Sequence, residues 1–245
     1  MLNILVPLGG KSVFFESNEY PFPKPLIEIG GVPMIQRVLD CLHGIAEKKR
    51  FLFVVNESDC HKYHLDNVLN LLTENRAIIL RLTGENKGAA CSALMAIEHI
   101  DNEDTLVISN GDQVIEEDLN RALSFFGERK ADAGVITFES VHPKWSYVRV
   151  GEAGRVIETA EKRPVSKHAI AGFYYFRRGR DFVKAAMRSI EKDASVNGAY
   201  FIAPCLNEMV LENKRIEMFP IEDRQYKSFY SPQKIKEYEK ELERK

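Results

Sequence analysis

The chain of 245 residues is 44% hydrophobic and carries 34 Lys and Arg against 36 Asp and Glu, which gives a formal net charge of −2. This near balance excludes the broad basic surface typical of nucleic-acid-binding proteins, so an anionic ligand must be held by a few local cations. The length suits one α/β domain with a sizeable core, and we predict a single domain over residues 1–245.

The first half of the chain predicts strands that alternate with helices, a pattern typical of parallel strands covered by helices on both faces. The predicted strands span residues 3–8, 51–55, 77–82 and 105–109. The predicted helices follow the Gly30-Gly31 turn with an apolar stripe from Met34 to Leu42, start at a Ser58 cap and reach Leu72, and run from Gly88 to Ile97.

The second half predicts closely spaced strands at residues 134–138, 146–150, 156–159 and 170–176, which indicates antiparallel pairing and a substrate lid. Helices at 180–191 and 201–212, a strand at 215–221 and a final helix after Ser231-Pro232 complete the pattern. Charges alternate in sign from Lys234 to Lys245, and we expect a solvated helix face there.

Neither an apolar run of about 18 residues nor a basic flank beside the apolar opening is present, so we expect no membrane contact and a cytoplasmic location. The four cysteines form no C-x-x-C pair, which favours reduced thiols in the core.

A glycine pair follows the first predicted strand, at the edge where a doubly wound sheet leaves its ligand crevice. Gly9 and Gly10 let backbone N–H groups approach an anion closely. Lys24, in Pro23-Lys24-Pro25-Leu26, adds an ammonium group near this loop.

Asp112 follows the predicted strand at 105–109, which brings a carboxylate to the same edge of the sheet. Mg²⁺ commonly binds one or two protein carboxylates together with substrate phosphates and water, so this position suits a magnesium ligand. The alternative is a turn aspartate that caps a helix starting near Glu116.

The segments Val6–Gly10 and Tyr20–Leu26 resemble the opening of sugar-phosphate nucleotidyltransferases, which pair a glycine-rich loop with a Pro-Lys-Pro-Leu lysine. Further segments follow in the order of that family: 83–90, 110–113, 161–162 and 171–176. The segments 142–147 and 197–201 resemble the short, single-domain branch associated with surface-polysaccharide precursors.

The resemblance implies a Rossmann-like, GT-A-like α/β fold: a three-layer sandwich with a mixed, mainly parallel sheet. Residues 1–115 would bind a nucleoside triphosphate and residues 116–245 a sugar or polyol phosphate, with Mg²⁺ as cofactor. Nucleic acid and membrane are not expected partners, and a homodimer is compatible with the sequence. The implied activity is transfer of a nucleoside monophosphate to the acceptor phosphate with release of pyrophosphate, for capsule or surface-polysaccharide precursors.

The resemblance also implies roles for individual residues. The nucleotide contacts would be Leu8, Gly9, Gly10, Lys11, Asn86, Gly88, Ala89 and Gly111. The catalytic residues would be Lys24, Asp112 and Lys162, and the acceptor contacts Glu161, Gly172, Tyr174 and Asn197. Asp112 would hold the metal, with Asp223 as a candidate second ligand.

The loop departs from the family pattern, which continues as Gly-x-Gly-Ser/Thr-Arg. Here Ser12, Val13 and Phe14 occupy the positions of the second glycine, the hydroxyl residue and the arginine. Lys11 offers a nearby charge without the planar fork of a guanidinium. A catalytically silent nucleotide-binding or regulatory protein therefore stays open as an alternative.

Other readings have less support. A glycosyltransferase of the same nucleotide-binding fold is a second alternative, but Asp112-Gln113-Val114 lacks the second aspartate of a D-x-D motif. The small residues after Gly88 also suit plain close packing against the sheet. Cys60, His61 and His64 are a weak zinc signal.

Overall fold

The central sheet begins with parallel strands in the first half of the chain. The computed structural model describes residues 1–10, 14–15, 19–84, 86–152 and 154–244, and in this part of the chain the sheet has nine strands. The parallel strands are β1 (Leu2–Pro7), β4 (Lys49–Asn56), β5 (Ile78–Leu82) and β6 (Thr105–Ser109), in the spatial order β6-β1-β4-β5. Their carboxyl ends therefore lie at one edge of the sheet.

The second half extends the sheet with mostly antiparallel pairs, as predicted. The added strands are β8 (Ala133–Glu139), β9 (Ser146–Val150), β10 (Val156–Glu161), β11 (His168–Phe176) and β12 (Ile216–Pro220). β11 is antiparallel to β6, β8 and β9, β10 is antiparallel to β9, and β12 runs parallel to β8. The sheet is therefore mixed, with its parallel pairs concentrated in the first half.

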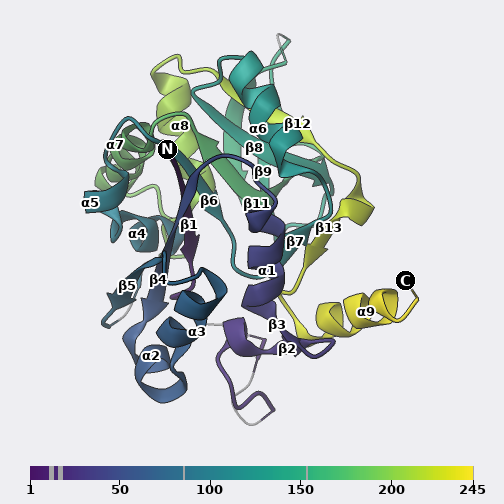
Figure 1. Ribbon diagram of the computed structural model, residues 1–245. Coiled ribbons are helices and arrows are strands. Elements are labelled where there is room, and N and C mark those ends of the chain that lie inside the picture. The colour runs from purple at the N-terminus through teal and green to yellow at the C-terminus, as the bar shows by residue number, and fades with distance from the viewer. Residues whose placement is uncertain (11–13, 16–18, 85, 153, 245) are drawn as a thin grey trace.

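Helices cover both faces of the sheet, which makes three layers (Figure 1). One face carries α1 (Met34–His43), α2 (Glu57–Tyr63), α3 (Leu65–Leu72) and α6 (Leu119–Glu128). The other carries α4 (Ala89–Leu94), α5 (Ile97–Ile100), α7 (Gly179–Glu191) and α8 (Ile202–Leu211). Along β1, Ile4 and Val6 lie in the first core and Leu5 in the second, because successive strand side chains point to opposite faces.

Two predicted helices are each divided in the structure. The segment expected to form one helix from Ser58 to Leu72 begins instead at Glu57, and His64, with a φ of 53°, separates α2 from α3. A left-handed residue cannot continue a right-handed helix, so the chain turns there. The predicted helix from Gly88 to Ile97 likewise ends at Leu94, and α5 begins anew at Ile97.

Two small sheets were not predicted. β2 (Glu28–Ile29) pairs with β3 (Val32–Pro33), and β7 (Gln113–Ile115) pairs with β13 (Tyr226–Ser228). The three-residue helices η1 (Lys24–Leu26) and η2 (Asp223–Gln225) precede β2 and β13.

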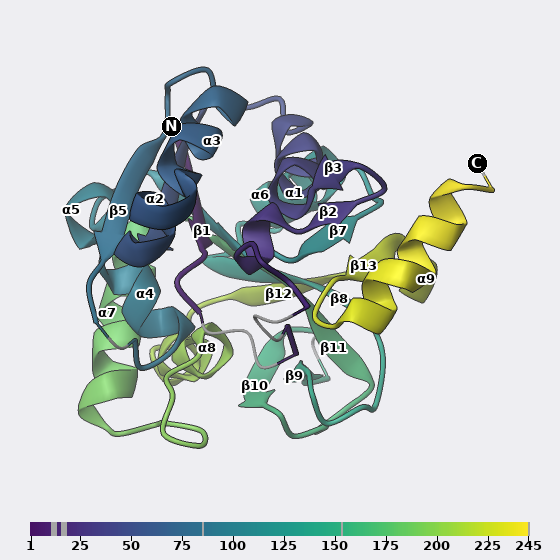
Figure 2. The ribbon, with the colours of Figure 1, turned by 90° about the horizontal axis from the view of Figure 1, so that it is seen from below.

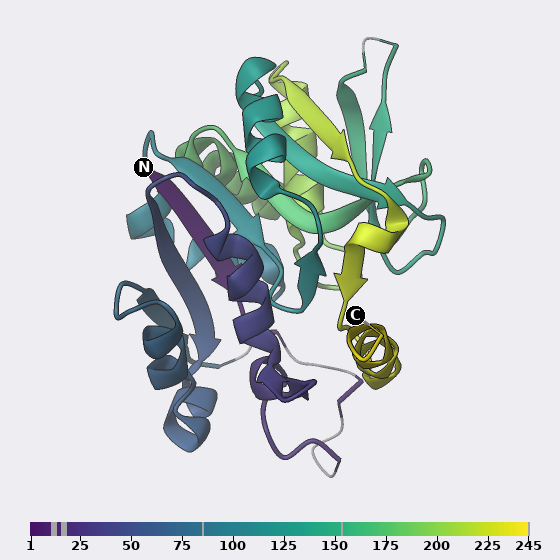
Figure 3. The ribbon, with the colours of Figure 1, turned by 45° about the vertical axis from the view of Figure 1, so that its right-hand side comes forward.

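The last helix, α9 (Pro232–Leu242), packs against these small sheets and is seen end-on in Figure 3. Its exposed side carries the charges that the sequence predicted to be solvated. Its other side buries Ile235 and Tyr238 in a third core with Ile29, Met34 and Phe229. Gly30 N also donates a hydrogen bond of 2.9 Å to the carboxylate of Glu239 on α9.

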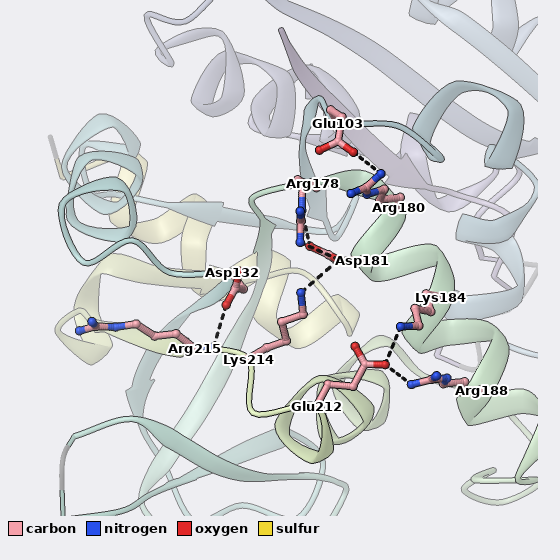
Figure 4. A network of polar contacts seen from close by, with 10 residues as sticks. All are labelled: Glu103, Asp132, Arg178, Arg180, Asp181, Lys184, Arg188, Glu212, Lys214 and Arg215. Carbon is pink, nitrogen blue, oxygen red and sulfur yellow. Dashed lines mark hydrogen bonds and ion pairs between the residues drawn. The ribbon is translucent and has the colours of Figure 1, made fainter.

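A polar network joins α7, α8 and the start of β12 at the edge opposite the carboxyl ends of the parallel strands (Figure 4). Asp181 accepts from Arg178 at 2.8 Å and lies 3.6 Å from Lys214, while Glu212 pairs with Lys184 and Arg188. Ion pairs near the surface contribute little each, so the network mainly sets how these elements meet.

All four cysteines are free thiols and lie in helices, with Cys60 and Cys205 buried. Burial raises the pKa of Cys205 to about 12, which keeps this thiol protonated. None of the helices in the described part of the chain combines the length and apolar character needed to cross a membrane.

Candidate active site

A cavity of about 530 Å³ lies at the carboxyl edge of the parallel strands. Figure 2 looks onto this edge, where β1, η1, α8 and the β9–β10 hairpin come together. Both halves of the chain contribute to its lining: Pro7, Leu8, Gly10, Pro23, Lys24, Pro25, Asn56, Asp59, Ala89, Asn110, Gly111, Asp112, Lys144, Trp145, Ser146, Glu161, Ile170, Gly172, Tyr174, Phe201, Ile202 and Tyr226. The volume is in the range of small-molecule sites.

Lys24 and Asp112 meet in this cavity as an ion pair, although 88 residues separate them in the chain. Their side chains are 22% and 27% exposed, so both remain accessible to a ligand. The Lys24 ammonium also lies 5.5 Å from the centroid of the Phe15 ring. The structure thus brings together the two groups that the sequence placed at the same edge.

Asp112 does not cap a helix, so the alternative interpretation of this residue is wrong. Asp118 is the N-cap of α6, and its carboxylate accepts from Asn120 N at 3.0 Å. The carbonyl of Asp112 instead accepts from Phe229 N at 2.8 Å, beside the β7–β13 pair. The Asp112 carboxylate therefore lies in the cavity, where it pairs with Lys24.

The two glycines after β1 have different roles: Gly10 lines the cavity, and Gly9 packs against Leu82. Leu8 and Gly10 line the cavity, and the Leu8 N–H donates to the Val54 carbonyl at 2.7 Å. A Cβ at Gly9 would lie 3.0 Å from Leu82 Cδ2, so this glycine permits close packing. Lys11 lies outside the described residues.

Gly88 is required by packing. Its φ is 114°, and a Cβ would lie 2.3 Å from the Tyr200 carbonyl oxygen. Asn86 holds the turn by accepting from Gly88 N at 3.1 Å and donating to the hydroxyl of Ser92. The small residues of this segment thus serve close packing, as the simpler explanation of their pattern predicts. Ala89 also lines the cavity.

Gly111 and Gly172 shape the end of β6. A Cβ at Gly111 would lie 2.2 Å from Leu8 Cδ2. Gly172 has a φ of 58°, and its carbonyl accepts from Asn110 N at 2.9 Å and from Gln113 Nε2 at 3.0 Å. These two hydrogen bonds fix the backbone on both sides of Asp112.

The side of the cavity formed by β9 and β10 contains a half-buried carboxyl group. Glu161 accepts a hydrogen bond from the Ser146 hydroxyl across the β9–β10 pair. Burial raises the pKa of Glu161, although Ser146 and the charge of Lys162 oppose the shift. Burial and the charge of Glu161 raise the pKa of the neighbouring Tyr174, so its hydroxyl stays protonated as a donor.

Six of the predicted site residues that the structure describes lie outside the cavity lining: Gly9, Asn86, Gly88, Lys162, Asn197 and Asp223. Lys162, at a φ of 54°, is exposed and places its ammonium 4.9 Å from the ring centroid of Phe201. Asn197 is exposed, with a φ of 53°, in the turn between Val196 and Ala199. Asp223 in η2 accepts from Glu139 N at 2.9 Å.

Several lining residues were not among the predicted site residues. Asn56 ends β4 at the same edge as Asp112, and its amide donates to Asp59 at 3.1 Å. The sequence signal that could have identified Asn56 and Asp59 as site residues was their position at and just after the end of a buried strand. Lys144, Trp145 and Tyr226 enter through tertiary contacts that the sequence does not reveal.

The donor set suits a hard cation that shares its ligands with a substrate. Among the described residues, no group of three or more His, Cys, Asp or Glu is placed to hold a metal. This counts against a zinc site at Cys60, His61 and His64, where His61 pairs loosely with Glu57 at 3.8 Å. An accessible carboxylate at Asp112 matches the partial protein ligation that Mg²⁺ accepts.

Proteins of known sequence resemble the chain at low identity. The GlmU bifunctional protein of Methanococcus aeolicus is 26% identical over 216 residues, which cover 86% of this chain and 48% of that protein. The chain therefore spans about half the length of this relative. The UTP–glucose-1-phosphate uridylyltransferase AglF of Haloferax volcanii is 26% identical over 183 residues, covering 71% of this chain and 72% of that protein.

Solved structures share the fold. The nucleoside-diphosphate-sugar pyrophosphorylase of Vibrio cholerae RC9 has a TM-score of 0.82 at 22% identity, covering 97% of this chain and 99% of its own. A UDP-glucose pyrophosphorylase complexed with UDP-glucose has a TM-score of 0.79 at 16% identity, covering 100% and 99%. The predicted fold class is confirmed.

The nucleotidyl transferase family matches residues 20–223, which is most of the chain. This match includes Lys24, Asp112 and the segments 161–162 and 171–176, on which the resemblance depends. The resemblance is thereby confirmed, and the chain belongs to the nucleotidyl transferase family.

Proposed function

We propose that this protein transfers a nucleoside monophosphate from a nucleoside triphosphate to a sugar or polyol phosphate and releases pyrophosphate. The observation that carries the proposal is the pairing of Lys24 with Asp112 in a cavity lined by both halves of the chain. The family to which the chain belongs and the likeness of its fold to a nucleoside-diphosphate-sugar pyrophosphorylase support the same reaction class.

The reaction needs positioning and charge neutralisation more than a protein base. An acceptor phosphate oxygen attacks the α-phosphorus in line, and the bond from that phosphorus to the bridging oxygen of pyrophosphate breaks. A phosphate monoester is already largely anionic near neutral pH, so no general base is required. Lys24 would hold phosphate oxygens of the nucleotide.

Mg²⁺ is the proposed cofactor, and Asp112 would hold it together with phosphate oxygens. When bound, the ion would neutralise charge on the phosphates. The present pairing of Asp112 with Lys24 shows that this carboxylate already stabilises a positive charge inside the cavity. Asp223 is turned to the backbone of Glu139, and we do not assign it to the metal.

The acceptor would lie against the β9–β10 hairpin. Glu161 and Tyr174 line the cavity there. Glu161 would accept hydrogen bonds from hydroxyl groups of a sugar or polyol, and the Tyr174 hydroxyl would donate hydrogen bonds to them. Gly172 lets β11 pack closely against Asn110 and Gln113 on this side, because a Cβ there would lie 2.3 Å from both side chains. The likeness of segments 142–147 and 197–201 to the surface-polysaccharide branch supports precursors of such polymers as the product, made in the cytoplasm.

The test is pyrophosphate release with CTP, UTP, dTTP, GTP or ATP, each with Mg²⁺ and a panel of sugar and polyol phosphates. Lys24→Ala and Asp112→Asn are expected to lower turnover by about 10²-fold or more, the scale at which a preorganised charge contact acts. Lys236→Ala and Asp101→Asn, at exposed positions outside the cavity, are the matched controls. Unchanged turnover in both cavity variants would reject the proposed mechanism.

The same experiment separates the alternatives. Nucleotide binding measured by calorimetry, with no pyrophosphate release from any pair, would indicate a catalytically silent binder, as the aromatic residue at Phe14 allows. Release of a nucleoside diphosphate from a sugar nucleotide would instead identify a glycosyltransferase.

A further inference from the structure

Lys144 is a cation of the cavity that the sequence did not assign to the site. It follows β8 in the loop before β9 and lines the cavity with Lys24. Its ammonium lies 3.7 Å from the ring centroid of Tyr230 and 4.4 Å from that of Trp145, and it is half-buried. Two aromatic faces therefore hold this charge in place by cation–π attraction.

The two lysines of the lining differ in their partners. Lys24 is neutralised by Asp112. Within the described residues, the Lys144 ammonium has no carboxylate within ion-pair distance, although its charge acts on Glu237 of α9. The pKa of Glu237 is lowered chiefly by its hydrogen bond from Lys234 and only weakly by the charge of Lys144, so that carboxylate already has a closer partner. An anion entering the cavity thus meets Lys144 as an available cation.

The rings that hold Lys144 are themselves braced by other aromatic residues. Trp145 and Tyr230 contact each other with centroids 5.9 Å apart, and Phe14 packs edge-on against Tyr230 at 5.9 Å. Trp145 also contacts Tyr226, which lines the cavity, at 5.5 Å. This bracing limits the conformations of Lys144, so less side-chain entropy is lost when a ligand binds.

We propose that Lys144 binds a substrate phosphate group, as the free ammonium of an aromatic stack formed by Phe14, Tyr230 and Trp145. The inference rests on the proposed function and adds a binding residue to the same cavity. The phosphate belongs either to the nucleotide or to the acceptor, and the two arms of the experiment distinguish these sources.

The test uses calorimetry of the full chain with two probes: tripolyphosphate with Mg²⁺ for the nucleotide arm, and glucose 1-phosphate for the acceptor arm. Lys144→Met is expected to weaken one probe by about 10- to 100-fold, the scale of a lost hydrogen bond to a charged group. Lys144→Gln should do the same, whereas Lys144→Arg should retain most of the affinity. Lys167→Met, at an exposed lysine outside the lining, is the matched control.

Trp145 provides an independent signal because it is the only tryptophan of the chain. A phosphate bound to the Lys144 ammonium adds negative charge beside the indole ring, so the emission of the wild-type protein and of Lys167→Met should change with the same dissociation constant as in calorimetry. A smaller change is expected in Lys144→Met at equal probe occupancy.

The outcomes are distinct from those of the turnover assay. Loss of probe binding in Lys144→Met and Lys144→Gln supports the inference even if no substrate pair releases pyrophosphate. Equal affinities of wild type and both variants for both probes would overturn it, even if turnover is found. A wild-type protein that binds neither probe would overturn it as well.

Discussion

Glu161 shows how the surroundings of one residue alter its chemistry. Its carboxyl group is placed in the cavity wall by the pairing of Glu161 with Ser146, and burial there disfavours the charged form. The hydrogen bond from Ser146 and the charge of Lys162 offset only part of this effect. The group is therefore suited to exchange hydrogen bonds with a sugar hydroxyl, and its charge costs folding stability at neutral pH.

Glu161→Gln should raise thermal stability in a pH-dependent way. A carboxyl whose pKa is raised in the folded state destabilises the fold once it is ionised, so the difference grows as the pH rises from about 4, the ordinary pKa of Glu, through the folded value. We expect the Tm of the variant to exceed that of the wild type by about 2 °C at pH 8 and to match it near pH 4.

Scanning calorimetry from pH 4 to pH 8 measures this difference, with Glu98→Gln as the exposed control. A variant that is less stable than the wild type at pH 8 would contradict the assigned cause, namely burial of the charge.

At the scale of elements, α9 supports the segment that carries Lys24. Ile235 and Tyr238 of α9 share a core with Ile29 and Phe229, and β2 follows directly after η1. The same core lies beside the hydrogen bond from Phe229 N to the Asp112 carbonyl. The helix therefore braces both partners of the cavity ion pair without lining the cavity itself.

Ile235→Ala should lower the free energy of unfolding by about 2–4 kcal/mol, because it removes a buried side chain and leaves a cavity. Lys236→Ala, one position later on the exposed side, should change it by less than about 0.5 kcal/mol. Urea denaturation followed by circular dichroism gives both values. Similar values for the two variants would show that α9 is not packed as described.

At the scale of the whole molecule, the two halves of the chain, residues 1–115 and 116–245, share one sheet and one set of cores. β6 of the first half pairs with β11 of the second, from Leu106 opposite Phe176 to Ser109 opposite Phe173. The core on the α7–α8 face likewise mixes side chains from both halves. Neither half can bury its apolar surface alone.

We therefore predict one cooperative unfolding transition for residues 1–245. Trp145 fluorescence reports on the second half of the chain, and far-ultraviolet circular dichroism reports on the helices of both halves. The urea transitions of these two signals should therefore coincide within error. Two separated midpoints would show that the halves unfold as independent domains. Addition of a binding nucleotide with Mg²⁺ should move both signals together to higher urea.

What the sequence determined by itself was the part of the protein encoded in local patterns. The buried strands are apolar runs, and strands of this kind place their carboxyl ends together, so the convergence of Lys24 and Asp112 on one edge followed from residues 3–8, 23–26 and 105–112. The order of the family segments then indicated the fold and the family.

Only the tertiary structure decided which distant residues meet in and around the cavity. The β7–β13 pair joins Gln113 to Ser228, Gly88 packs on Tyr200, and Lys144 lies on Tyr230. Each contact joins residues far apart in the chain, where no periodicity or spacing records that they meet. The physical reason is that side-chain packing depends on how the layers are assembled, which a local pattern of apolar and polar residues does not specify.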